Sequence, residues 1–377
     1  MRPILSRAAF CLGLCLLGLP SCQRPPERST PPGIIITHSP VSTHRYIGSP
    51  SLAVMPDGEY IASHDFFGPN SNEDKSGLTE IFASRDHGAT WEPRATIDGA
   101  FWSKLFVHRG QLYLQGVEKA GGDIVIRRSD DAGRTWTSPV DENSGRLFHG
   151  KYGCAPTPFI EHGGRLWRAM GSKMLSAPSE ADLLKASSWT LSKPCPPPRQ
   201  LGEAFREWGE GNAVITPDGR VADLMKIRYF EPGDDRAGLI TVSPDGKSAT
   251  ADPATCLVKM PGGRLKFTVR FDPVSKQYWA LTNYLMPQDY GPRTDLRRNT
   301  VALVSSPDLQ NWTLRSVLLH DPDVSYHGLQ YLDWEIEGQD LIALCRTAWP
   351  DGEGGPNRQH DANYLTFHRF KGFRDLR

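Results

Sequence analysis

Short apolar, strand-like runs alternate with turn-forming residues along the chain from about residue 45 to residue 370. Six tight turns each separate two such runs and so mark hairpins. They are Pro56-Asp57-Gly58, His108-Arg109-Gly110, His162-Gly163-Gly164, Pro217-Asp218-Gly219, Asp272-Pro273 and Glu337-Gly338. A second hairpin follows each of them, which predicts six four-stranded units at about 47–97, 100–140, 152–195, 208–255, 264–319 and 326–370. Repetition of such units is typical of a β-propeller.

A repeated motif occupies the turns of the outer hairpins. Ser84–Trp91 and Ser129–Trp136 both read S-x-D-x-G-x-T-W, and Ser306–Trp312 is a degenerate copy. The Ser and Asp side chains bind turn amides, Gly adopts a positive φ, and Trp packs against the neighbouring unit. The motif resembles the Asp-box (BNR repeat) of the sialidase-like β-propeller superfamily. The resemblance implies an all-β fold with six blades, or seven if residues 34–37 belong to a further degenerate blade instead of closing the ring onto the last one.

The N-terminal segment has the pattern of an export signal. Arg2 and Arg7 precede an apolar stretch at residues 8–19 that is too short to span a bilayer. The sequence Leu19-Pro20-Ser21-Cys22 resembles a bacterial lipobox, which implies lipidation of Cys22; a plain secretory signal is the alternative. We therefore expect a signal peptide at 1–22, a tether at 23–33 and the propeller at 34–377, in a lipoprotein of the outer membrane, periplasm or cell surface that contacts the membrane through its lipid alone.

Composition limits the partners. The charges of the 43 basic and 43 acidic residues cancel, so the chain lacks the net positive charge that nucleic-acid binding requires. We also expect the protein to be a monomer. The 36 Gly and 31 Pro argue against a helical bundle. No pair of cysteines has the spacing of a zinc site, so no cofactor or metal is predicted, although a Ca²⁺ ion held by carbonyl oxygens would leave little trace in a sequence. The widely spaced Cys154, Cys195, Cys256 and Cys345 fit either one disulfide or four buried thiols.

The blade pattern also predicts where a site would lie. In a propeller, residues before the first strand and after the second strand of each inner hairpin meet at one mouth of the central channel. The candidate residues at or near these positions are His44, His64, Trp102, His149, Tyr152, Arg168, Glu210, Asn212, Arg228, Asn283, Tyr326, His327, Arg346 and His360. Arg forms bidentate contacts with carboxylates and aromatic rings stack on sugars, so this set favours an acidic, uronate-containing or sulfated glycan. The alternative is that these strand-end residues are merely solvated.

The spacings His44 to His64 and Tyr152 to Arg168 resemble the catalytic set of the ulvan-lyase-type propeller polysaccharide lyases. The resemblance implies that Arg168 and a His neutralise a uronate carboxylate, which acidifies the C5 proton. It also implies that Tyr152 removes this proton and protonates the leaving oxygen, giving β-elimination. His149 is an alternative for the functional His. A polysaccharide lyase is therefore the first functional prediction.

A sialidase-type glycoside hydrolase is the second prediction. The Arg-Ile-Pro motif of sialidases is absent, since Arg45–Pro50 reads RYIGSP, and the following loop offers only Glu73 and Asp74. The resemblance still allows a triad of Arg168, Arg228 and Arg346 and a nucleophile pair of Tyr326 or Tyr152 with Glu210. A lipoprotein that binds glycans without catalysis is the third prediction.

Overall fold

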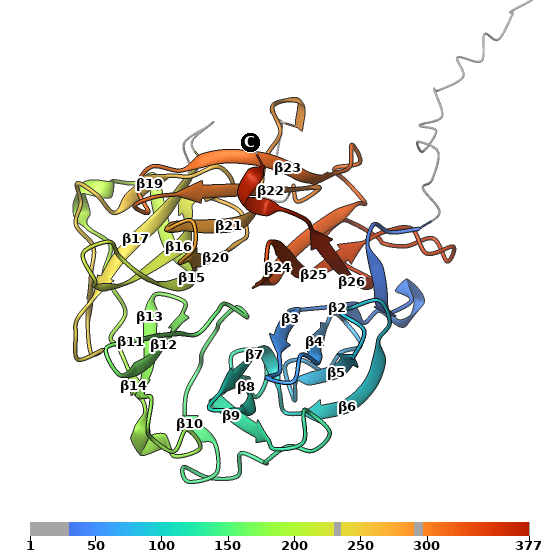
Figure 1. Ribbon diagram of the computed structural model, residues 1–377, viewed down its shortest axis with the longest axis horizontal. Helices are drawn as coiled ribbons and strands as arrows, with labels where there is room; N and C mark the ends of the chain where they lie inside the picture. The colour runs from blue at the N-terminus through green and yellow to red at the C-terminus, as the bar shows by residue number, and fades with distance from the viewer. Residues whose placement is uncertain (1–29, 230–234, 290–296, 377) are drawn as a thin grey trace, which may run out of the picture.

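Six antiparallel β-sheets form a ring about a common axis in the computed structural model, which describes residues 30–229, 235–289 and 297–376 (Figure 1). The predicted all-β, six-bladed propeller is confirmed. All six predicted inner turns join two consecutive strands of one blade, β3 and β4 in blade 1 and the first two strands in each of the others.

Blades 1 to 3 occupy the first half of the described chain. Blade 1 comprises β2 (Tyr46–Ile47), β3 (Ser51–Val54), β4 (Tyr60–Phe67), β5 (Leu78–Ser84) and β6 (Glu92–Asp98). Blade 2 comprises β7 (Phe101–His108), β8 (Gln111–Val117), β9 (Ile124–Ser129) and β10 (Arg146–Phe148). Blade 3 comprises β11 (Ile160–His162), β12 (Arg165–Met170), β13 (Lys173–Pro178) and β14 (Thr190–Leu191).

Blades 4 to 6 complete the ring. Blade 4 comprises β15 (Phe205–Ile215), β16 (Val221–Tyr229), β17 (Arg236–Val242), β18 (Ala249–Thr250) and β19 (Leu257–Lys259). Blade 5 comprises β20 (Phe267–Asp272), β21 (Gln277–Asn283), β22 (Thr300–Ser306) and β23 (Thr313–His320). Blade 6 comprises β24 (Gly328–Glu337), β25 (Asp340–Ala348), β26 (Tyr364–Phe370) and the N-terminal β1 (Ile34–His38). The helices are short 3-10 turns: η1 (Val41–Thr43), η2 (Ala186–Ser188), η3 (Arg199–Leu201), η4 (Pro287–Asp289) and η6 (Phe373–Asp375).

The ring is closed by the N-terminal strand. β1 pairs antiparallel with β26, with Ile34 opposite Phe367, so the last blade takes its outer strand from the start of the propeller (Figure 1). Residues 34–37 therefore close the sixth blade, and the seven-blade alternative is wrong. Because an edge left unpaired here would expose strand amides and carbonyls, the closure also protects blade 6.

The repeated outer turns have one hydrogen-bond pattern. In the first copy, the Asp86 carboxylate accepts the backbone N–H of Thr90 at 2.9 Å, and the Ser84 hydroxyl accepts the N–H of Gly88 at 2.9 Å. Gly88 has a φ of 86°, which explains why this position is glycine. The indole of Trp91 donates to the Gly88 carbonyl at 3.1 Å. Equivalent contacts occur in the second copy, and the third keeps those of Asp and Trp, with Asn311 in place of Thr.

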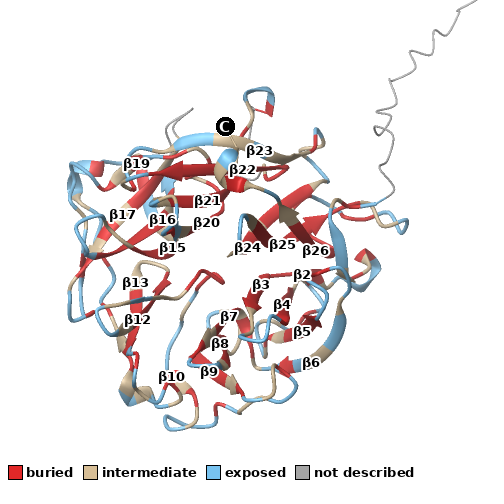
Figure 2. Cartoon of the chain, in the orientation of Figure 1, coloured by how far each residue is buried: buried red, intermediate tan, exposed pale blue. Residues whose placement is uncertain are grey.

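The core consists of apolar layers between neighbouring blades. Figure 2 shows the strands largely buried and the connecting loops largely exposed. One layer joins blades 1 and 6 through residues such as Ile47, Leu52 and Leu344, and another joins blades 2 and 3 through Phe106 and Leu175. The alternating apolar positions of each strand therefore pack against the blades on either side.

A buried charge cluster joins three blades near the axis. Lys104 of blade 2 is 2% exposed and pairs with Asp333 of blade 6, and it also donates to the Leu52 carbonyl at 3.0 Å. Arg270 of blade 5 lies 3.6 Å from Asp333 and 2.5 Å from Glu335. Two cations thus face two carboxylates, so the cluster is balanced in charge.

Several predictions for the N-terminus fall outside the described part of the chain. The signal peptide at 1–22, Cys22 and residues 23–29 of the tether lie there. In the described ranges no helix is long and apolar enough to cross a membrane. The four cysteines that are described, at 154, 195, 256 and 345, are all buried free thiols.

Candidate active site

A cavity of about 540 Å³ opens at the face where the inner hairpins have their free ends, opposite their turns; we call this the open-end cavity. Its charged, polar and aromatic lining residues include Ser49, Asp65, Phe67, Glu73, Phe101, Trp102, Glu207, Trp208, Glu210, Lys226, Arg228, Tyr331, Arg346 and His360. They come from blades 1, 2, 4 and 6 and their loops. A cavity therefore lies at the mouth of the channel where the sequence predicts the site.

Three of these residues reach the cavity through irregularities in the innermost strands. The register shifts between Phe101 and Lys104 in β7, between Trp208 and Gly211 in β15, and between Gln330 and Asp333 in β24. The shifted segments contain Trp102, Glu210 and Tyr331, and all three side chains line the cavity. Bulges of this kind redirect side chains and are frequent next to active sites.

Two of the bulge residues have strained backbones. Trp102 has a φ of 49° and Tyr331 a φ of 52°, a region that bulky side chains rarely occupy. Such a conformation costs on the order of 1–3 kcal/mol and is maintained only where surrounding contacts impose it. Strain at two aromatic residues of one cavity marks this face as a candidate for function.

Tyr331 and Glu210 form a hydrogen-bonded pair in the cavity. The Tyr331 hydroxyl donates to Oε1 of Glu210 at 3.3 Å. The other carboxylate oxygen, Oε2, pairs with the ammonium of Lys266, which is 7% exposed. The guanidinium groups of Arg346 and Arg298 lie 5.0 and 5.6 Å from the centre of the Tyr331 ring. A phenol with an adjacent carboxylate and a cationic surrounding is an arrangement suited to nucleophilic attack.

Asp65 is a buried carboxylic acid on the wall of the same cavity. Its side chain is 1% exposed, and its two oxygens accept the backbone N–H groups of Ser49 at 2.7 Å and Trp102 at 2.6 Å. Burial raises the pKa of Asp65 to about 6, although these two hydrogen bonds oppose the shift. A carboxyl group that keeps its proton near pH 6 can act as a general acid.

Arg346 brings a buried positive charge to the cavity. It donates to the His360 carbonyl at 2.5 Å, while its Nε has no hydrogen-bond partner among the described residues. Burial lowers the pKa of Arg346 to about 10, so it stays charged at neutral pH. Within the described ranges, Arg346 has no carboxylate at ion-pair distance. Burial also lowers the pKa of the adjacent His360 to about 4, so that its imidazole is neutral.

Five of the residues predicted for the site line the open-end cavity. They are Trp102, Glu210, Arg228, Arg346 and His360. Arg228 is exposed at the rim and lies 3.4 Å from Glu207. The other predicted residues do not line it.

Two of the four residues of the predicted lyase set are buried in structural contacts. His64 lies on β4 with its side chain between Phe66 and Phe82, and its Nδ1 is 2.9 Å from the Asp65 carbonyl. Arg168 is fully buried and donates to the carbonyls of Gln115 and Ala155, each at 2.7 Å. Arg168 therefore ties blade 3 to blade 2, and it takes no part in the predicted arginine triad at the cavity.

The remaining two residues of that set lie in loops. His44 is exposed and ends the short helix η1. The hydroxyl of Tyr152 donates to the carbonyl of His149 at 3.3 Å, and the ammonium of Lys173 lies 4.9 Å from its ring centre. His149 is itself exposed and pairs with Asp123 at 2.8 Å. His44, His64, Tyr152 and Arg168 are thus not brought together in the cavity.

The other predicted residues outside the cavity have identifiable local roles. Asn212 is buried and joins blades 4 and 5, accepting the N–H of Val269 at 3.1 Å. His327 stacks on Trp349 at 4.0 Å and pairs with Asp321. Tyr326 is 37% exposed in the loop before β24. Buried Asn283 donates to the carbonyl of Leu329 at 2.6 Å and so joins blades 5 and 6. The predicted partner of Glu210 was Tyr326 or Tyr152, whereas the structure pairs Glu210 with Tyr331.

Sequence reasoning missed Asp65, Tyr331, Lys266 and Arg298. Asp65 directly follows the predicted His64, and adjacent residues of a strand face opposite sides of the sheet. Tyr331 lies inside β24, where only the bulge turns it toward the cavity. A break in the alternation of apolar and polar residues at Gln330-Tyr331-Leu332-Asp333 is the sequence signal that could have revealed the bulge.

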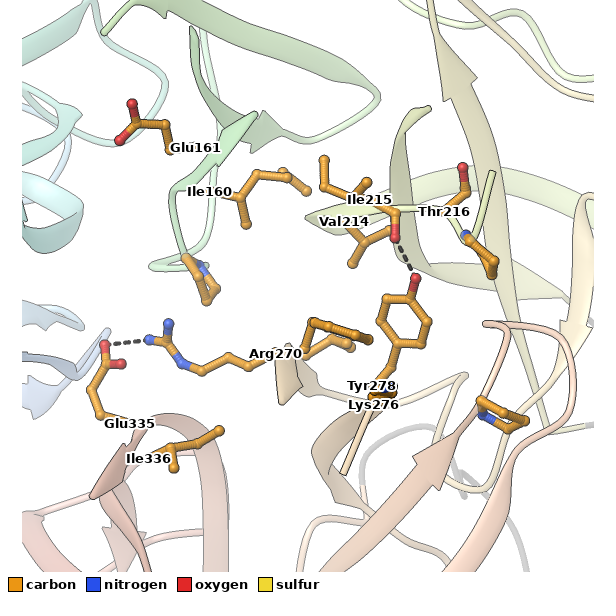
Figure 3. Close-up of a pocket in the computed structure, with 16 residues that line it drawn as sticks. Ile160, Glu161, Val214, Ile215, Thr216, Arg270, Lys276, Tyr278, Glu335 and Ile336 are labelled. Carbon is orange, nitrogen blue, oxygen red and sulfur yellow. Dashed lines mark hydrogen bonds and ion pairs between the residues drawn. The ribbon is translucent and has the colours of Figure 1, made fainter. Parts of the chain in front are cut away.

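A second cavity of about 740 Å³ opens at the opposite face, near the inner turns of blades 4 and 5. Figure 3 shows Arg270 extending across it to Glu335, and the Tyr278 hydroxyl bonded to the Ile215 carbonyl. Much of the remaining wall is aliphatic, including Ile160 and Val214. Because its Arg270 and Glu335 are already paired, this cavity offers less reactive chemistry than the open-end cavity.

Among the described residues, no group of three or more His, Cys, Asp or Glu side chains has an arrangement that could hold a metal ion. The structure thus supplies no candidate metal centre within those ranges.

The comparisons with known proteins locate the fold. No family model matches the chain, and no curated protein matches it. The solved structure of Penicillium chrysogenum α-L-arabinanase with arabinobiose has a TM-score of 0.55 at 15% identity, over 92% of this chain and 99% of that chain. A Hadza microbial sialidase has a TM-score of 0.56 at 15% identity, over 90% and 68%. The GH93 α-L-arabinofuranosidase of Fusarium graminearum has a TM-score of 0.56 at 12% identity, over 89% and 97%. At these identities the likeness shows a shared β-propeller fold.

Proposed function

We propose that this chain is a glycoside hydrolase that cleaves the bond to an acidic sugar in the open-end cavity. The observation that carries the proposal is the hydrogen bond from Tyr331 to Glu210 in the same cavity as the buried acid Asp65. A nucleophile, a base that activates it and a separate proton donor are the three groups that a two-step hydrolysis requires. The structural neighbours named as arabinanase, arabinofuranosidase and sialidase support a carbohydrate substrate.

In the first step Glu210 takes the phenolic proton of Tyr331, and the phenolate oxygen attacks the anomeric carbon. The bond from that carbon to the leaving oxygen breaks, and Asp65 gives its proton to this oxygen. In the second step Asp65, now a carboxylate, removes a proton from water, which attacks the glycosyl-tyrosine and releases the sugar. Glu210 returns the proton to Tyr331. The anomeric configuration is retained because it inverts twice.

The unpaired charge of Arg346 supports an acidic sugar. A buried guanidinium without a carboxylate partner is costly, and a substrate carboxylate would supply the missing charge in bidentate geometry. Arg298 is nearly buried, donates to Gln330 at 2.7 Å and adds positive charge behind the Tyr331 ring. Asp65 and Asp361 act on Arg346 from beyond ion-pair distance, so a neutral sugar such as arabinose would leave it without a direct carboxylate partner.

Hydrolysis is favoured over the β-elimination predicted from the sequence. That prediction required His44, His64, Tyr152 and Arg168 to surround one uronate, but His64 and Arg168 are buried and do not line the cavity. Elimination on a uronate polymer would raise the absorbance near 235 nm, whereas hydrolysis would release a reducing sugar without this chromophore.

The test uses aryl glycosides of sialic acid, of glucuronic acid and of arabinofuranose with wild-type protein and Tyr331→Phe. We expect turnover of an acidic glycoside by the wild type and loss of kcat in Tyr331→Phe, with glycan binding retained. A rise near 235 nm on uronate polymers would establish a lyase instead. Binding without turnover of any of these substrates would establish a glycan-binding protein.

We further propose that the chain is exported and anchored through a lipid on Cys22. The apolar segment and lipobox-like sequence at residues 8–22 support this. Incorporation of labelled palmitate by the wild type and its loss in Cys22→Ala is the expected result; equal labelling of both would contradict it.

A further inference from the structure

Lys266 is a buried lysine that contacts both members of the Tyr331–Glu210 pair. It directly precedes β20 and reaches from blade 5 to residues of blades 4 and 6. Its ammonium pairs with Oε2 of Glu210 and lies 4.3 Å from the centre of the Tyr331 ring. Because Oε2 is occupied by Lys266, the other oxygen of Glu210 is the one directed at the Tyr331 hydroxyl.

This position is an unfavourable one for a cation. Burial, followed by the charges of Arg298 and Arg346, lowers the pKa of Lys266 well below its usual range. The contact with the Glu210 carboxylate opposes this shift and favours the charged ammonium. Glu210 from β15 is the one carboxylate paired with Lys266 in the described ranges, and Lys226 from β16 lines the same small internal cavity. A lysine whose only role was to join blades would be less destabilising at a position away from the two arginines, where it would meet less repulsion.

We propose that Lys266 is a positioning residue for the nucleophile, an inference that rests on the proposed hydrolase function. Its ammonium fixes the Glu210 carboxylate so that Oε1 accepts the proton of Tyr331. The same charge lies over the face of the ring, where it stabilises the negative charge that develops on the phenol as the O–H bond breaks. Tyr331, Glu210 and Lys266 then act as a unit in which a third group orients the base.

The experiment compares Lys266→Ala with the wild type on the acidic aryl glycoside that the wild type hydrolyses. We expect kcat to fall by about 100-fold or more, the size of a general-base contribution, with KM changed by less than about threefold. Added propylammonium should raise the kcat of Lys266→Ala at least about tenfold by occupying the space of the deleted side chain. Sodium chloride at the same ionic strength should not.

Lys104→Ala is the matched control, because Lys104 is also buried and pairs with a carboxylate, Asp333, but has no hydrogen bond, ion pair or ring contact with Tyr331 or Glu210 in the described ranges. It should lose stability, and propylammonium should not change its kcat. Near-ultraviolet circular dichroism establishes that each variant is folded, and Lys266→Met provides a second variant that fills the space without charge.

The outcomes separate the two proposals. An active wild type with Lys266→Ala and Lys266→Met within about twofold of its kcat would overturn the role of Lys266 and leave the hydrolase standing. A folded Lys266→Ala whose lost kcat is not restored by propylammonium would also overturn it. So would an equal increase of kcat by propylammonium in Lys266→Ala and in the Lys104→Ala control. A wild type that hydrolyses no glycoside would overturn the hydrolase proposal, and the role of Lys266 with it.

Discussion

Asp65 should make the stability of the protein depend on pH in a direction opposite to that of most carboxylates. Its pKa is raised by burial from 3.8 to about 6 in the folded protein. Between these values the folded state holds a proton that the unfolded state has released. The free energy of unfolding therefore falls as pH rises, by 1.36 kcal/mol per pH unit, or about 3 kcal/mol in total between about pH 4 and pH 6.

Replacing Asp65 with Asn removes this pH dependence and lowers the stability by an amount that does not change with pH. An amide has one acceptor oxygen, so one of the N–H groups of Ser49 and Trp102 loses its partner, which costs about 1–3 kcal/mol. The variant should thus be less stable than the wild type near pH 4. The deficit should shrink by about 3 kcal/mol by pH 7, where the wild type bears the cost of an ionised buried Asp65.

The assay is urea unfolding of both proteins at half-unit intervals from pH 4 to pH 7.5. Histidines with lowered pKa values, such as His368 at about 4, lose stability toward acid, but they do so equally in both proteins and cancel in the difference. Parallel curves of unfolding free energy against pH would refute the assignment of a raised pKa to Asp65. On a glycoside with a poor leaving group, kcat/KM of the wild type should also decline above about pH 6 as the acid form is lost.

Three further predictions concern other parts of the molecule. Arg346→Met should raise KM for an acidic glycoside at least about tenfold, which corresponds to the loss of one charged hydrogen bond, and should leave binding of a neutral glycoside unchanged. Equal effects on both glycosides would contradict the proposal that Arg346 binds a substrate carboxylate. Lys104→Met should lower the unfolding free energy by up to about 3–5 kcal/mol, because buried Asp333 loses its nearest cation and keeps only Arg270 at 3.6 Å, and an additional Asp333→Leu should recover part of it in urea unfolding. Gly88→Ala should lower the melting temperature more than Gly110→Ala. Both glycines have a positive φ, but only at Gly88 would the new Cβ lie 2.3 Å from the ring of Phe367. Equal melting temperatures of the two variants would argue against that contact.

The sequence determined the architecture because its signals are local. Each inner turn is set by a few residues, such as Pro217-Asp218-Gly219, whose backbone preferences hold whatever surrounds them. The motif of Ser84–Trp91 satisfies its own turn through contacts within a few residues. Period-two alternation then gives the strands, and six repeats of one unit give the number of blades and the ring. The mouth of the channel that carries the candidate site follows from the same repetition.

The identity of the site residues was decided only by tertiary structure. Arg168 and Arg346 both lie near the end of the second strand of a blade, yet carbonyls of Gln115 and Ala155 surround the first, while the second lines the cavity. His64 and Asp65 are adjacent, and the strand directs one into the core and the other to the cavity. These outcomes depend on contacts with residues from other blades, which no local pattern encodes.

Tyr331 is the clearest case. It is one residue among several aromatic and polar residues at the start of β24, and its sequence context differs little from that of Tyr326. A shift of register in the pairing with β25 and a φ of 52° turn it toward Glu210 of another blade. The propeller thus follows from short-range turn chemistry and periodicity, whereas the candidate site follows from a bulge and from charges brought together across blades far apart in the chain.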